Sequence, residues 1–154
     1  MHNDLWTHAV QLYARPGVQE SCLQLQSQGT NVCLLLCAAW LAETGVAFSP
    51  QRLAALAAIA DPWHQQVVTP LRQLRQQWRT QAQADDALGP LREQVKGLEL
   101  QAERTLLERL QALCNEWPRE GATQAQVWLE QAVPAEARDN RGALQVLRAA
   151  VTST

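Results

Sequence analysis

The sequence of 154 residues has few of the side chains that favour β-sheets. Isoleucine, phenylalanine and tyrosine occur once each, as Ile59, Phe48 and Tyr13. Strands favour β-branched and aromatic side chains, so this scarcity argues against a sheet. Alanine, leucine and glutamine dominate instead, and they lose little rotamer freedom in a helix. The composition therefore predicts an all-α fold.

Long apolar runs and an export signal are also lacking. The segment Met1–Trp6 has neither a cationic start nor an apolar core. The longest uninterrupted apolar run, Val32–Ala42, is about half as long as the roughly 20 residues that a spanning helix needs. We expect no membrane association and a cytoplasmic location.

Neither sign of charge is in large excess. The formal net charge is −2 and the isoelectric point is about 5.9. Binding to nucleic acid through phosphates needs many cations on one face, so we expect nucleic acid to be an unlikely partner. A nucleic-acid-associated regulator is therefore the weakest of the functions that the sequence allows, although a local basic patch is compatible with this charge.

Motifs of common enzymes are missing. The sequence has no glycine-rich phosphate loop and no Ser-x-Gly elbow that would give a histidine a catalytic task. The histidines are His2, His8 and His64, for which we expect polar surface or interface roles. We predict no catalytic residue and no cofactor, and lean towards a protein that is not an enzyme.

Carboxylates close in sequence are the next candidates for acid–base chemistry. The pairs are Asp85 with Asp86, Glu99 with Glu103, and Glu103 with Glu108, beside Arg104 and Arg109. Alternating charges of this kind are typical of a solvated helix face. We therefore interpret all of them as surface charges.

Four cysteines, at Cys22, Cys33, Cys37 and Cys114, lie in apolar surroundings. Cys33 and Cys37 are four residues apart on one helix face, and with Cys22 and His8 or His64 they would form a thiolate-rich metal site. Structural zinc sites, however, use short loops between paired cysteines. We expect reduced thiols packed in the core and predict no metal site.

Capping residues and apolar spacing predict a compact bundle of about seven or eight helices, in a single domain covering residues 1–154. The predicted helices are Asp4–Tyr13, Pro16–Gln28, Val32–Thr44, Pro50–Ala60, Pro62–Gln83, Pro90–Trp117, Thr123–Val133 and an amphipathic segment over Leu144–Val151. Asn3 is an alternative first cap, and Pro70 predicts a kink or short break. Val32–Thr44 is apolar on nearly all sides and should be central.

The composition shifts near residue 85. Residues 1–84 read as a compact core, and residues 90–154 as a long helix followed by C-terminal helices that extend from it or dock on it. Along the long helix, apolar residues recur every three or four positions, as in a coiled-coil seam. They are Leu91, Val95, Leu98, Ala102, Leu106, Leu110, Leu113 and Trp117.

One basic stripe stands out in the predicted fifth helix. Arg72, Arg75 and Arg79 fall at i, i+3 and i+7, beside an apolar stripe that includes Trp78. Guanidinium groups in a row can hold a phosphate or an acidic surface. The candidate interaction or ligand surface consists of Trp63, His64, Arg72, Arg75, Trp78 and Arg79. The alternative is a solvated helix face.

Several segments together resemble a family of small bacterial proteins known as a domain of unknown function. They are Asp4–Trp6, Tyr13–Val18, Cys22–Gln26, Asn31–Leu36, Trp40–Ala42, Pro62–Trp63 and Val67–Arg75. The resemblance extends over about residues 4–115 and implies a helical fold in a bacterial cytoplasm, but no activity. The family has asparagine where this chain has Cys33, which lowers the weight of Cys33 as a shared site.

The absence of catalytic motifs and the amphipathic long helix favour a non-enzymatic accessory protein. It would bind another protein, or a second copy of itself, through helix faces, most simply through the stripe from Leu91 to Trp117. The alternative is a small-molecule-binding or enzymatic helical protein. Its pocket would lie near Trp63, Trp78 and the three arginines.

Overall fold

The computed structural model describes residues 4–121 and 124–152, and its regular structure is helical, as predicted. The first elements are α1 (Leu5–Tyr13), α2 (Val18–Ser27), α3 (Val32–Glu43), α4 (Pro50–Trp63) and the π-helical η1 (His64–Val68). The later elements are α5 (Thr69–Gln77), α6 (Arg79–Ala84), α7 (Leu88–Cys114), α8 (Ala125–Gln131), α9 (Ala135–Arg138) and α10 (Arg141–Thr152). Within the described ranges, no helix combines the length and hydrophobicity that crossing a bilayer requires.

Three helices begin where the predicted side-chain caps lie. Backbone N–H groups donate to Asp4 Oδ1 (2.7 Å), Asn31 Oδ1 (3.3 Å) and Ser49 Oγ (3.0 Å) at the starts of α1, α3 and α4. Each bond satisfies an amide that has no partner within its helix. These predictions are confirmed, whereas Asn3 and the predicted cap Thr123 lie outside the described residues.

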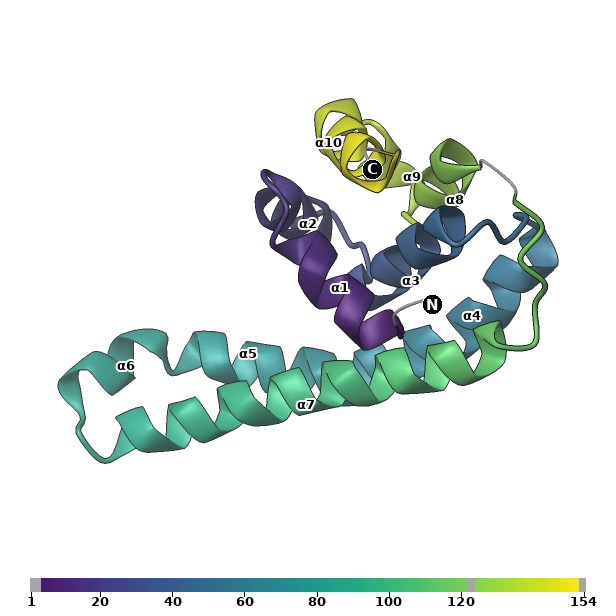
Figure 1. The fold of residues 1–154 in the computed structure, drawn as a ribbon. Helices are drawn as coiled ribbons and strands as arrows, with labels where there is room; N and C mark the ends of the chain where they lie inside the picture. Colours follow the sequence, from purple (N-terminus) through teal and green to yellow (C-terminus); the bar gives the residue numbers. More distant parts are fainter. Residues whose placement is uncertain (1–3, 122–123, 153–154) are drawn as a thin grey trace.

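Helix α3 is the centre of the molecule, as its sequence predicted. Eleven of its twelve residues are buried. It contacts α1, α4, α7, α8 and α10, and Figure 1 shows it among these helices. The core draws on both halves of the chain, because Leu35 shares one apolar cluster with Leu106, Trp128 and Leu147.

A helical hairpin extends from this core. Helices α4, η1, α5 and α6 run along α7, and Figure 1 shows α5, α6 and the first half of α7 projecting beyond the other helices. We call α5, α6 and residues 88–102 of α7 the hairpin arm. The predicted long helix is confirmed, with its start at Leu88 and its end at Cys114.

The prediction that a helix ends before Pro62 is wrong, and a π-helical turn stands where a short break is predicted before Pro70. Helix α4 continues through Pro62 to Trp63 instead of ending near Ala60, and the chain stays helical through Pro70. Proline removes a helical N–H and pushes away the carbonyl four residues earlier. Those carbonyls belong to the exposed residues Ala58 and Gln66, where water can satisfy them.

The π-helical turn before Pro70 takes the place of the predicted break. In η1 the Thr69 N–H donates to the His64 carbonyl five residues earlier. This wider turn is characteristic of a π-helix. The prediction that Pro16 starts a helix is also wrong, because Gly17 adopts a φ of 78° and α2 begins at Val18.

Candidate functional site

The basic stripe predicted on Arg72, Arg75 and Arg79 is divided by the structure. Helix α5 ends at Gln77 and α6 begins at Arg79, so the turn at Trp78 interrupts the helical spacing. Arg79 is exposed, whereas Arg72 and Arg75 reach across to α7. The three guanidinium groups therefore do not form one continuous surface.

Arg72 and Arg75 converge on a buried carboxylate, Glu99. Arg72 Nε donates to Glu99 Oε2 at 3.1 Å, and Arg75 donates from Nε to Oε1 at 2.5 Å and from Nη2 to Oε2 at 3.3 Å. Only 6% of Glu99 is exposed, so its interpretation as a surface charge is wrong. Burial acts to raise the pKa of this carboxyl, but the hydrogen bonds and charges of Arg75 and Arg72 outweigh burial and lower it.

Trp63 of the predicted surface has structural contacts, and Trp78 and His64 lie where the helix geometry changes. The Trp63 indole N–H donates to the Ala102 carbonyl at 2.9 Å, and the Arg109 guanidinium lies 4.3 Å from its ring centroid. Half-buried Trp78 occupies the turn between α5 and α6. His64 lies at the start of η1, where burial and the charge of Arg72 lower its pKa against the opposing effect of Asp61.

An apolar groove lies on another face of α7, between α1, α2 and α3, and its volume is about 460 Å³. We call it the α1–α7 groove. Trp6, Val10 and Leu100 are among its apolar lining residues, and Val10 and Leu100 are respectively 50% and 56% exposed. Exposed apolar side chains around a concavity are typical of binding sites. Its residues are outside the predicted surface, which lay along Trp63–Arg79.

Three ionisable side chains line the α1–α7 groove: Tyr13, Cys33 and Glu103. Burial is the main cause that raises the pKa of each of them. For Glu103 the charge of Arg72 partly opposes burial, and the charge of Glu99 reinforces it. Such perturbed groups in a concave site mark a candidate binding site. Glu103 is half-buried, so its interpretation as a solvated surface charge also needs correction.

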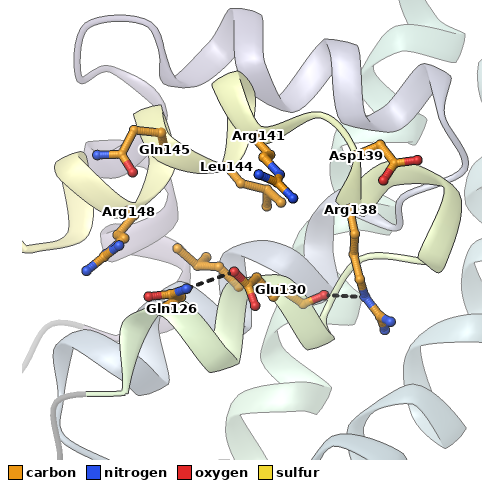
Figure 2. A pocket seen from close by; sticks show the side chains of 9 residues that line it. Gln126, Glu130, Arg138, Asp139, Arg141, Leu144, Gln145 and Arg148 are labelled. Carbon is orange, nitrogen blue, oxygen red and sulfur yellow. Dashed lines mark hydrogen bonds between the residues drawn. The ribbon is translucent and has the colours of Figure 1, made fainter.

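A second hollow, of about 490 Å³, lies between α8, α9 and α10 (Figure 2). Exposed Arg138, Arg141 and Arg148 line it, together with the carboxylates of Glu130 and Asp139. Arg138 Nε donates to the Glu130 carbonyl at 3.0 Å. The guanidinium groups suit an anion, but the two carboxylates offset part of their charge.

His8 is buried, which differs from the surface or interface role expected for it. Its Nε2 contacts the Glu43 carboxylate, and Arg15 Nη1 donates both to that carboxylate and to the Ala150 carbonyl. His8 therefore helps to hold α1 on α3, and Arg15, in the loop after α1, links Glu43 to the C-terminal helix α10. The predicted role of His2 lies outside the described residues.

All four cysteines are buried free thiols, in keeping with their apolar surroundings. Cys37 Sγ and Cys114 Sγ lie 3.6 Å apart. Burial raises the pKa of Cys22 to about 12, and the contact with Cys114 together with burial raises the pKa of Cys37. Among the described residues no group of three potential ligands is placed to hold a metal ion.

We expect these thiols to react slowly in the folded protein. The thiolate is the reactive form and all four thiols are buried, so modification by a disulfide reagent should be slowed at least about a hundredfold. The measurement is a thiol titration with Ellman's reagent in native buffer and in denaturant, where all four cysteines should react rapidly. Rapid reaction of even one native thiol would contradict the burial described here.

Comparison with known proteins gives one match. A family model described as a protein of unknown function (DUF2390) matches residues 4–110. Every residue that lines the α1–α7 groove falls within this range, whereas the arginine-lined hollow lies beyond it. No curated protein and no solved structure matches the chain.

Proposed function

We propose that this chain, which belongs to the DUF2390 family of proteins of unknown function, is a non-enzymatic protein that associates with a second copy of itself through the hairpin arm. The observation that carries the proposal is an exposed leucine pair on the outer face of α7. Leu91 and Leu98 are respectively 50% and 51% exposed, and they lie seven residues apart on the same helix. This is the spacing of a coiled-coil seam.

An uncharged stripe continues from these leucines. Gln94 and Gln101 are exposed and Thr105 is partly exposed, at three- and four-residue intervals from Leu91 and Leu98. A stripe without charge has no strong preference for a partner of either sign. It is complementary to an antiparallel copy of itself, and such two-fold interfaces are the commonest in homo-oligomers.

Gly97 beside this stripe supports the same interpretation. A glycine within a helix costs roughly 1 kcal/mol relative to alanine. Apart from its two chain neighbours and the adjacent backbone of its own helix, no atom of the described residues lies within 4 Å of the position that a Cβ would occupy there. The glycine is therefore not required by packing within the chain, and it leaves room for a second helix to approach closely.

Part of the apolar stripe predicted to self-associate is buried within the molecule. Val95, Ala102, Leu106 and Leu110 are buried within the molecule. They form part of the surface that α7 presents to its own chain, so they are not available to a partner. We therefore place the contact with a second copy on Leu91 and Leu98 rather than on the whole stripe to Trp117.

The test is sedimentation equilibrium over a wide concentration range. We expect the wild type to shift from monomer to dimer, and the double variant Leu91→Glu/Leu98→Glu to weaken association at least about tenfold, about 1.4 kcal/mol. Leu23→Glu is the matched control, because Leu23 is 49% exposed on α2. It should dimerise like the wild type, and circular dichroism should show all three proteins folded.

Two results would overturn the proposal. One is a wild type that remains monomeric at every concentration, and the other is a double variant with unchanged association.

We further propose that the protein acts in a bacterial cytoplasm. The unbonded thiols of Cys37 and Cys114, 3.6 Å apart, support this location, since reducing compartments keep such pairs as thiols.

A further inference from the structure

A carboxylate faces the α1–α7 groove without a direct partner. Glu103 lines the groove, and among residues 4–121 and 124–152 no hydrogen bond or ion pair is found for its carboxyl. The nearby guanidinium groups of Arg72 and Arg75 are instead bonded to Glu99, one helical turn earlier on α7. Glu103 is therefore the charged group that the groove offers to a ligand.

Aromatic rings accompany this carboxylate. Trp6 and Tyr13, both from the α1 segment, line the groove together with Glu103. The faces of such rings attract organic cations. The Trp6 ring already interacts with one cation, because the Arg104 guanidinium lies 5.0 Å from its centroid. A carboxylate with two aromatic rings is a suitable set of groups for an ammonium ion.

The remainder of the lining is suited to an apolar tail. Val10, Leu36, Leu100 and Leu107 contribute hydrocarbon surface from three helices. The volume of about 460 Å³ is within the range of small-molecule sites, roughly 300–1,000 Å³. A peptide or a protein segment is not needed to fill a groove of this size.

From these observations we infer that the α1–α7 groove binds a small organic ammonium ion with an apolar tail. The ammonium group contacts Glu103 and the rings of Trp6 and Tyr13, and the tail lies along Leu100 and Leu107. An anionic head group would be repelled by the Glu103 carboxylate, and a neutral hydroxyl would donate one hydrogen bond to it without the charge that strengthens the bond of an ammonium ion. The inference goes beyond self-association and does not depend on it.

Three probes with one tail and different head groups test this site. Isothermal titration calorimetry at pH 8 would compare octylammonium with octanol and octanoate, all below their aggregation concentrations. Octylammonium should bind at least about tenfold more tightly than either of the others, since the charged contact is available to it alone. Equal affinity for octanol, or no binding of octylammonium, would overturn the inference.

Two variants on the same helix locate the interaction. Glu103→Gln should weaken octylammonium binding at least about tenfold and leave octanol binding unchanged. Glu93→Gln is the matched control, because the Glu93 side chain is 67% exposed. Thermal unfolding would establish that both variants are folded. Unchanged octylammonium affinity in Glu103→Gln, or an equal loss in Glu93→Gln, would show that the cation does not bind at Glu103.

Discussion

Replacing Trp128 with alanine is expected to lower the free energy of unfolding by about 3–5 kcal/mol. Trp128 is fully buried on α8, where its indole N–H donates to the Val46 carbonyl at 2.9 Å. Its ring meets Phe48 edge to face, with 5.0 Å between centroids. Alanine would leave a cavity in the core. It would also remove the hydrogen bond between the indole N–H and the Val46 carbonyl.

Urea denaturation followed by circular dichroism would measure this loss. Trp128→Phe is the informative comparison, because phenylalanine keeps a ring against Phe48 but cannot donate to Val46. We expect it to cost about 1–3 kcal/mol, the penalty for a carbonyl left without its donor plus some lost volume. If Trp128→Ala were as stable as the wild type, α8 would not be docked on the core as described.

Replacing Glu99 with glutamine is expected to destabilise the protein by about 3 kcal/mol, because it leaves two guanidinium groups without their counter-ion. The side chains of Arg72, Arg75 and Glu99 are respectively 13%, 25% and 8% exposed. Water therefore reaches Arg72 and Arg75 only in part and cannot fully replace the carboxylate. The lost stability should come mainly from weaker packing of α5 against α7.

The pH dependence of stability provides a second measurement. Since the pKa of Glu99 is lowered in the folded state, its contribution is complete above the unfolded pKa of about 4.3 and is lost as the pH falls through the folded pKa. Glu99→Gln should flatten this acidic part of the profile. A triple variant with methionine at positions 72, 75 and 99 should recover most of the stability, because it leaves no charge unpaired.

A stability change below about 1 kcal/mol in Glu99→Gln would contradict this interpretation of the ion pairs, since exposed pairs contribute no more than that. An unchanged acidic profile would do so independently. The two measurements together separate a buried ion-pair network from side chains that merely lie close in space.

Local signals in the sequence were sufficient for much of the fold. The caps at Asp4, Asn31 and Ser49 fixed the starts of their helices, because each supplies a specific hydrogen bond to a neighbouring amide. The nearly continuous apolar character of α3 predicted its burial. These features depend on residues a few positions apart, which is why they could be predicted without tertiary contacts.

The interior of the hairpin arm could not be predicted in the same way. Leu98 belongs to the predicted apolar stripe of α7, yet it is exposed, and its neighbour Glu99 is buried. Val95, Glu99 and Ala102 have the same helical spacing, but hydropathy favoured the leucine. The burial of Glu99 depends on Arg72 and Arg75 on another helix, which supply the charge that makes it favourable.

The α1–α7 groove could not be predicted from the sequence either, for the same reason. Tyr13, Cys33 and Glu103 come from three helices, and their spacing in the sequence gives no indication that they share a surface. Their places in the sequence predict a core thiol at Cys33 and a surface charge at Glu103, with no link between the two. Only the packing of α1, α3 and α7 places them together.

The π-helical turn η1 has a consequence for how this chain can tolerate insertions and deletions. A π-helical turn accommodates about one residue more than the α-helical turn it replaces. Deleting one residue from 64–68 would therefore restore α-helical spacing and leave the helix beyond it in register, so that Arg72 and Arg75 would still face Glu99. Deleting one residue from regular α-helix would instead rotate everything after it by about 100°, one residue's share of a turn. The segment 64–68 is therefore the place in this helical run where related chains should most readily differ by one residue in length.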